Sequence, residues 1–147
     1  MGMHVGQRSM RRVSAERVGR LLIVSHNEEP PTDQEWDELL EVFAREHLDR
    51  LRLVVFTEGG GPTPAQQGRL ASALAGRPGT LQVAVISDRT AIRFIACTLA
   101  LFIRRLRTFR RAELDAALTY LQLAPVERRA VSRFLGEEAP ARRSYAS

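Results

Sequence analysis

The sequence contains no lysine, so all 22 of its basic residues are arginines. A GC-rich genome that favours arginine codons would explain this choice, and selection for bidentate contacts with anions is the alternative. Cys97 is the only cysteine, which excludes an internal disulfide and agrees with a reducing cytoplasm. The histidines and this cysteine are too widely spaced for a metal site, so we expect neither a metal nor a cofactor.

No apolar run in the sequence is long enough for a membrane span, which needs about 20 apolar residues. The most apolar stretch is residues 92–103, which Arg93 interrupts. Residues 1–20 contain no apolar run of signal-peptide length. We therefore expect a cytoplasmic protein in which residues 92–103 form a buried helix.

The residues that are present suit a single globular domain. The chain has 147 residues, of which 44% are hydrophobic and 27% are charged, enough for an ordinary core. Charge is distributed unevenly: residues 21–60 carry three arginines and ten acids, whereas residues 61–112 carry nine arginines and one acid. This asymmetry predicts an acidic face and a basic face, and such a field steers charged partners.

Short apolar runs alternate with amphipathic stretches along the chain. The runs are typical of buried strands and cover residues 21–24, 51–56 and 81–86. Thr32 lies three residues before Glu35, the spacing of a capping box, which predicts a helix from there to about residue 48. An edge strand at 11–17 is expected to form a hairpin with the first run. The other predicted elements are helices at 64–75, 90–106, 113–121 and from 125, and a short strand at 107–109.

This alternation predicts an α/β sandwich with a mostly parallel sheet of four to five strands, opened by a hairpin, and four to five helices. The domain is expected to span residues 11–136, with residues 121–136 as a C-terminal helical extension. Residues 1–10 lack periodicity and residues 137–147 are polar, so both are expected to be flexible tails.

Polar loops follow the predicted central strands at residues 25–27, 57–63 and 87–88. In a parallel sheet these loops meet at one edge, where ligands usually bind. The glycine run of residues 59–61 precedes a predicted helix, so it can hold an anion or form a flexible turn. No lysine follows the run, which excludes a nucleotide P-loop.

A hydrolase triad of His26, Ser87 and Asp88 is an alternative interpretation of the same loops. The sequence has no Gly-x-Ser-x-Gly nucleophile elbow to support it. We expect His26 to be a polar loop residue, and Ser87 or Asp88 to cap the next helix. The chain is therefore not predicted to be an enzyme, although a pocket that joined His26, Glu58 and Asp88 would point to one.

The densest basic cluster directly follows the apolar helix and consists of Arg104, Arg105, Arg107, Arg110 and Arg111. It indicates an acidic partner or an anionic lipid surface, with a solvated helix end as the alternative. The aromatic residues near it are Phe102 and Phe109, too few to suggest nucleic-acid binding.

Residues 92–103 are apolar on most sides of a helix, and one sheet cannot cover every side. The remaining apolar surface predicts a hydrophobic interface or dimer contact that includes Phe94, Leu101 and Phe102. Burial in the core and shallow membrane contact are the alternatives. Cys97 lies on the same helix and is expected to be a small buried side chain.

The two ends of the predicted domain resemble those of a STAS domain, the fold of bacterial anti-sigma factor antagonists. The opening hairpin reads RVSAERVGRLLIV over residues 12–24, and the last strand and helix read FRRAELDAALTYL over residues 109–121. The resemblance covers about residues 11–121 and extends to the related STAS/SEC14-like proteins of lipid-binding type. It implies a non-enzymatic signalling module.

The resemblance also points to a regulatory position. STAS antagonists carry an Asp-Ser-Ser/Gly-type motif at the start of the second main helix, where a partner kinase phosphorylates the serine. The matching residues 64–68 keep Gly68 but lack the aspartate and the serine. Thr63 is the nearest hydroxyl, and either phosphorylation or helix capping can account for it.

The resemblance implies that the module binds a regulatory protein, which would be kinase-like, a sigma regulator or a sensor, or a second copy of itself. The residues expected to contact this partner lie in the glycine loop and the first turn of the following helix: Glu58, Gly59, Gly60, Gly61, Pro62, Thr63, Gln66 and Gln67. The alternative is a module that binds a small ligand or an anionic lipid surface.

Overall fold

The computed structural model describes residues 12–146 apart from 49, 76, 78–80 and 102, with side chains up to residue 136. The tail predicted for residues 1–10 and Phe102 of the predicted interface lie outside the described residues. The strands of the sheet are β1 (Val13–Val18), β2 (Leu21–His26), β3 (Arg52–Thr57), β4 (Gln82–Ile86) and β5 (Arg105–Phe109).

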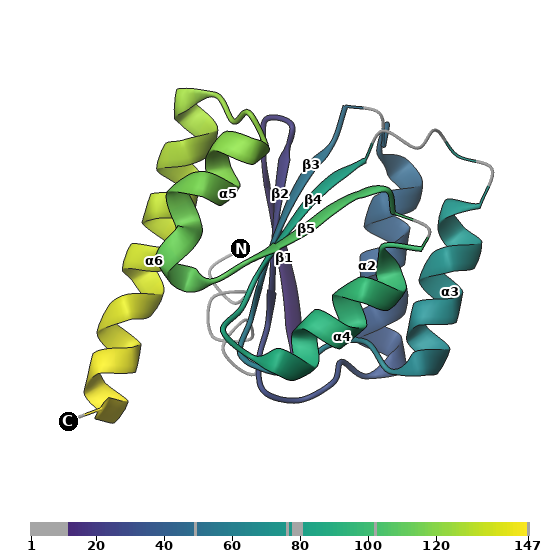
Figure 1. Cartoon of the computed structure of the whole chain (residues 1–147), viewed down its shortest axis with the longest axis horizontal. Helices are drawn as coiled ribbons and strands as arrows, with labels where there is room; N and C mark the ends of the chain where they lie inside the picture. Colours follow the sequence, from purple (N-terminus) through teal and green to yellow (C-terminus); the bar gives the residue numbers. More distant parts are fainter. Residues whose placement is uncertain (1–11, 49, 76, 78–80, 102, 147) are drawn as a thin grey trace.

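The strands lie in the sheet in the order in which they follow one another along the chain (Figure 1). β1 pairs with β2 in the antiparallel sense, and β2, β3, β4 and β5 pair in the parallel sense. Gly19 has a φ of +58° in the turn of the hairpin, a conformation that glycine adopts without strain. The structure thus confirms the predicted α/β class and the mostly parallel sheet opened by a hairpin.

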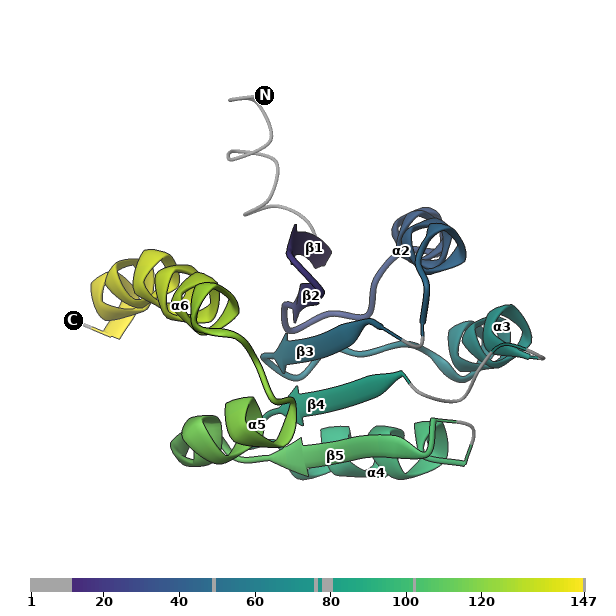
Figure 2. The same cartoon turned by 90° about the horizontal axis from the view of Figure 1, so that it is seen from above.

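Helices cover both faces of the sheet (Figures 1 and 2). The crossovers between neighbouring parallel strands are α2 (Asp33–Arg45), α3 (Pro64–Leu74) and α4 (Thr90–Leu99). When successive parallel strands are joined by crossovers of the same handedness, the three connecting helices lie on the same face of the sheet. The opposite face is covered by the elements that follow β5, which are a 3₁₀ turn (Arg111–Glu113), α5 (Leu114–Tyr120) and α6 (Pro125–Ala146).

Each face of the sheet has its own hydrophobic core, because the central strands are buried on both sides. Leu22 of β2 belongs to the core under α2, α3 and α4, whereas its neighbour Leu21 belongs to the core under α5 and α6. In the second core Phe56 stacks on Phe134 of α6, with ring centroids 5.4 Å apart. The continuous apolar runs of the sequence are therefore the strands that both helical layers cover.

Some predicted boundaries differ from the structure. α4 ends at Leu99 rather than at residue 106, and β5 begins at Arg105 rather than at residue 107. Pairing with β4 explains the difference, since Gln82 to Ile86 pair residue by residue with Arg105 to Phe109. Residues 137–146, predicted as part of a tail, lie within α6, which continues to Ala146.

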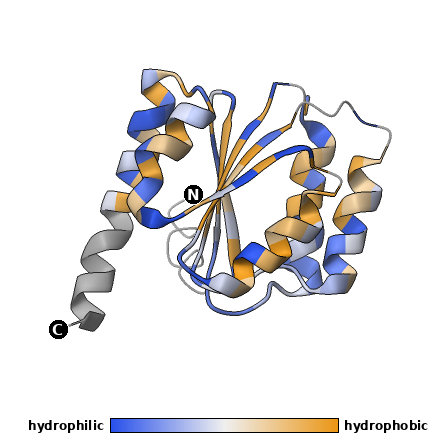
Figure 3. Cartoon of the chain, in the orientation of Figure 1, coloured by the Kyte–Doolittle hydropathy of each residue, from blue (hydrophilic) through white to orange (hydrophobic). Residues whose placement is uncertain are grey.

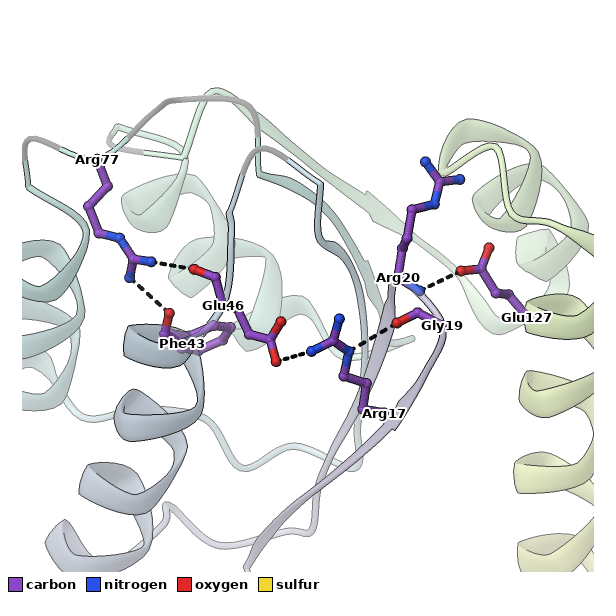
Figure 4. A network of polar contacts seen from close by, with 7 residues as sticks. All are labelled: Arg17, Gly19, Arg20, Phe43, Glu46, Arg77 and Glu127. Atoms are coloured by element: carbon purple, nitrogen blue, oxygen red, sulfur yellow. Dashed lines mark hydrogen bonds and ion pairs between the residues drawn. The ribbon is translucent and has the colours of Figure 1, made fainter.

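A polar network holds the amino-terminal edge of the parallel strands (Figure 4). Arg77 donates to two backbone carbonyls at the C-terminal end of α2, at 2.9 and 2.6 Å, where helix carbonyls lack intrahelical partners. One of these carbonyls belongs to Glu46, whose carboxylate pairs with Arg17 of the hairpin. Glu127 of α6 accepts a hydrogen bond from the backbone N–H of Arg20 at 2.9 Å. These contacts join helices of both layers to the hairpin, at the edge opposite the candidate loops.

Candidate functional site

The loops after β2 and β3 meet at the carboxyl edge of the sheet, as expected for parallel strands. The backbone N–H of Glu58 donates to the carbonyl of His26 at 3.1 Å, and that of Gly60 donates to the carbonyl of Asn27 at 2.8 Å. A Cβ atom on Gly60 would lie 2.2 Å from the carbonyl oxygen of Glu29, so only glycine fits there. The glycine run therefore forms a close-packed contact between the two loops.

The first turn of α3 is packed against α2. Thr63 and Gln66 form a capping box: the Thr63 hydroxyl accepts from the Gln66 N–H at 3.2 Å, and the Gln66 side-chain oxygen accepts from the Thr63 N–H at 3.0 Å. The Gln66 side-chain nitrogen donates to the carbonyl of Pro31 at 2.8 Å and to the carboxylate of Asp33 at 3.1 Å. Gln66 is only 2% exposed, so it acts as an internal support between the two helices.

This packing determines how much of the predicted partner-binding segment is accessible. The buried members of that segment are Gly60, Pro62 and Gln66. The half-buried members are Glu58, Gly59, Gly61, Thr63 and Gln67. Because the Thr63 hydroxyl already accepts the capping hydrogen bond, the predicted phosphorylation position lies in an ordinary helix cap.

The residues considered for a hydrolase triad have other partners. Ser87 Oγ accepts from the backbone N–H of Arg89 at 3.1 Å, at the start of α4. Asp88 accepts from the backbone N–H of Arg111 at 3.1 Å, and the Arg111 side chain pairs with Glu58 at 2.6 Å. The N-cap residue of α4 is Arg89, and no side chain caps this helix, so the prediction that Ser87 or Asp88 caps it is wrong. Asp88 instead joins the end of β4 to the chain after β5.

A cavity of about 80 Å³ lies between the sheet and helices α2, α3 and α4. Its wall consists almost entirely of apolar side chains of the first core, including Trp36. The other side chains with polar atoms in the wall are His26 and Thr57, at the carboxyl ends of β2 and β3. Glu58 and Asp88 are not part of the wall, so the cavity does not join them to His26.

His26 is a buried residue of β2, and the prediction that it is a polar loop residue is wrong. Only 5% of it is exposed, and its ring centroid lies 6.3 Å from that of Trp36. Its Nδ1 atom is buried and has no hydrogen-bond partner among the described residues. Burial lowers the pKa of His26 to about 4, an effect that the nearby carboxylate of Glu35 partly offsets. The imidazole is therefore neutral at pH 7.

A sequence signal for this burial exists. Successive residues of a strand face opposite sides of a sheet, so residues two apart share a side. Leu22, Val24 and His26 follow this spacing along β2, and Leu22 and Val24 lie in the first core. A predicted strand that continued to residue 26 would have placed the His26 side chain on the same face of the sheet as Leu22 and Val24, toward α2, α3 and α4.

α4 buries one side and exposes the other. Ile92 and Ala96 are buried, whereas Phe94 is 71% exposed and Leu101, just past the helix end, is 84% exposed. Phe94 lies in α4, and Leu101 follows the last residue of the helix by two positions. Cys97 lies between these two and is exposed, so the prediction of a buried cysteine is wrong. Figure 3 shows how much of α4 is hydrophobic. We define the α4 face as the exposed residues Arg93, Phe94, Cys97 and Leu101.

The five clustered arginines do not form one patch. Arg107 lies over the rings of Phe109 and Tyr120, 5.3 and 5.1 Å from their centroids, on the α5 side of the sheet. Arg111 is held by the ion pair with Glu58. The exposed members are Arg104, Arg105, Arg107 and Arg110. Of these, Arg104 is nearest in sequence to Leu101 of the α4 face. Arg93, which the predicted cluster omits, belongs to the α4 face.

Among the described residues, no group of three or more histidine, cysteine, aspartate or glutamate side chains is placed to hold a metal ion. Within the described part of the chain, no helix combines the length and the apolar character needed to cross a membrane. No family model, curated protein or solved structure matches the chain. The residues and their geometry are therefore the basis for assigning a function.

Proposed function

We propose that this chain is a non-enzymatic STAS-like interaction module, which binds an acidic regulatory protein through the α4 face and Arg104. The order of the elements, with a hairpin ahead of a parallel sheet, supports the STAS-like architecture. The exposure of Phe94 and Leu101 carries the proposal for binding. Isolated exposed apolar side chains are ordinary, whereas two large ones, one on α4 and one just past its end, indicate an interaction surface.

The charge around these two side chains indicates the chemistry of the partner. Arg107 and Arg111 are engaged elsewhere, so the charge near the α4 face comes from the exposed arginines closest to it in the sequence. Arg93 lies within the α4 face, and Arg104 follows Leu101 by three positions. Aromatic residues and arginine are enriched where proteins bind one another. The complementary surface is an apolar patch on the partner that is surrounded by aspartate and glutamate.

The proposal is tested by affinity capture of the tagged chain from a lysate of its native cells. The test variant is Phe94→Asp with Leu101→Asp, and the matched control is Val126→Asp, an exposed apolar residue on α6. We expect a regulatory protein in stoichiometric amount with the wild type and the control, and its loss with the test variant. Capture that is equal in both variants, or no stoichiometric protein at all, contradicts the proposal.

An anionic lipid surface is the second candidate, and the exposed arginines of this region, Arg93, Arg104, Arg105 and Arg110, favour it. Co-sedimentation with phosphatidylserine vesicles, and with phosphatidylcholine vesicles as the control, tests it. Binding that decreases with added salt and with Arg104→Glu plus Arg105→Glu supports lipid binding. Binding that neither change alters excludes it, because electrostatic attraction is screened by salt.

A further inference from the structure

We propose that β5, the outermost strand of the parallel part of the sheet, binds an extended acidic segment of another protein as an additional strand. β5 follows β4 at the end of the strand order, and in Figure 2 it lies at the outer edge of the sheet. Extended peptides bind such edges by pairing with backbone groups that face away from the sheet. The edge contains neither Phe94 nor Leu101, so this inference does not depend on the partner proposed for the α4 face.

The direction of the backbone groups of β5 follows from its pairing with β4. The carbonyl of Phe109 accepts a hydrogen bond from the N–H of Ser87 at 3.0 Å, so the backbone groups of Phe109 point toward β4. Because the backbone groups of successive residues point to alternate sides along a strand, those of Leu106 and Thr108 point away from the sheet. Among the described residues, no strand pairs with these outward groups. Two donors and two acceptors are therefore available to an added strand.

The exposed arginines of β5 determine the charge of the segment that fits. Arg105 and Arg107 are exposed and, being two positions apart, lie on the same side of the strand. Arg107 is held over the rings of Phe109 and Tyr120, and neither arginine forms an ion pair with a described residue. Acidic side chains at alternate positions of an added strand would lie beside these arginines, and opposite charges on neighbouring strands attract.

The other side of β5 selects the residues between the acids. Leu106 is half-buried and packs against the first core, and Thr108 is exposed on the same side of the strand. Branched apolar or hydroxyl side chains suit this side, since they favour strands and pack well across neighbouring strands. The expected segment therefore alternates aspartate or glutamate with valine, isoleucine or threonine.

The charge of β5 argues against a second copy of this chain as the added strand. Two β5 strands related by a twofold axis would place the arginines of one copy beside those of the other, which is destabilising. β1, the other edge strand, carries Glu16 next to Arg17 and so has no charge of a single sign. Charged residues on an edge strand also prevent aggregation, and an edge with that role alone would bind no acidic segment.

The experiment is a titration of the isotope-labelled full chain with a synthetic peptide of four Glu-Val repeats, followed by amide chemical shifts and amide hydrogen exchange. The control peptide has lysine in place of glutamate. We expect saturable shifts along β5 and slower exchange of the Leu106 and Thr108 amides. The glutamate peptide should bind at least about tenfold more tightly than the lysine peptide.

Substitution of Thr108 separates strand pairing from simple charge attraction. Thr108→Pro removes one outward N–H and suits an edge strand whose N–H faces solvent, whereas Thr108→Val retains the N–H. Thr108→Pro should bind the glutamate peptide at least about tenfold more weakly than Thr108→Val, because one hydrogen bond is lost and the proline ring occupies its place. Equal affinities would overturn the inference, since attraction to arginines alone, as by a lipid surface, needs no backbone donor.

Charge reversal is the second test, and it decides the question should Thr108→Pro not fold. Arg105→Glu with Arg107→Glu should bind the lysine peptide in preference to the glutamate peptide, the reverse of the wild type. The matched control, Arg129→Glu with Arg133→Glu, changes exposed arginines of α6 and should keep the wild-type preference. The inference is also overturned if β5 of the wild type shows no saturable shifts, or if charge reversal on β5 leaves the preference unchanged.

Discussion

The indole N–H of Trp36 donates to the backbone carbonyl of Gln66, with 2.9 Å between the nitrogen and the oxygen. This bond joins α2 to the first turn of α3 beside the cavity that Trp36 lines. The side chain of Gln66 adds contacts to Pro31 and Asp33 at the start of α2. Two helices that are distant in sequence are thus connected through one buried glutamine.

Gln66→Leu should destabilise the fold although leucine is apolar and similar in size. The substitution removes the acceptor for the Thr63 N–H and the donor for the Pro31 carbonyl. We expect the free energy of unfolding to fall by about 2–3 kcal/mol, as measured by urea denaturation. Gln67→Leu is the matched control, since that half-buried side chain makes one bond to Pro62 and should cost less than about 1 kcal/mol. Equal effects of the two variants would argue against the supporting role of Gln66.

Two glycines of neighbouring segments should respond in opposite directions to alanine. In Gly60→Ala the new Cβ atom meets backbone carbonyls of the adjacent loop, which cannot move aside easily, so we expect a loss of about 2–4 kcal/mol. Gly68 lies within α3 with open space around it, and Gly68→Ala should raise stability by about 0.5–1 kcal/mol. Thermal unfolding of both variants checks this, and a tolerated Gly60→Ala would show that the loop contact is loose.

The order of the elements could be predicted because local patterns specify it. The strands β2, β3 and β4 are apolar runs that two helical layers cover. A strand that is buried on both faces can be recognised in the sequence from such a continuous apolar run alone. The starts of α2 and α3 follow from Thr32, which forms the predicted capping box, and from Thr63, which forms the predicted helix cap. Such signals involve residues three or four positions apart, so the sequence alone reveals them.

The apolar character of residues 92–103 predicted the exposed Phe94 and Leu101 of the α4 face. The cavity and the end of α4 could not be predicted in this way because they depend on distant contacts. α4 ends where the chain must turn to pair five residues with β4, and this early end leaves Leu101 outside the helix. The cavity forms from side chains of several helices and strands whose shapes leave space between them. Apolar patterning reports that Leu39 or Ile92 is buried, and it contains no information on how closely each packs.

Thr63 provides a test that separates capping from charge. Thr63→Ala removes the side-chain acceptor for the Gln66 N–H and should lower stability by about 1 kcal/mol. Thr63→Asp keeps an acceptor and places a negative charge at a helix N-terminus, so its stability should stay within about 0.5 kcal/mol of wild type. Urea denaturation of both variants gives the comparison. An unstable Thr63→Asp would indicate that a charge, and hence a phosphate, is not accommodated there.

The burial of His26 predicts how stability depends on pH. Its pKa is about 4 in the folded protein and about 6.5 when exposed, so the unfolded chain binds more protons between these values. Stability therefore falls as pH decreases from 6.5 to 4, and the contribution of this group is about 3 kcal/mol over the window. His26→Phe should reduce the difference in unfolding free energy between pH 6.5 and 4 by that amount, as measured by urea denaturation at each pH. His47→Phe, which replaces a histidine at an exposed position, is the matched control. An unchanged slope in His26→Phe would show that His26 is not buried in its neutral form.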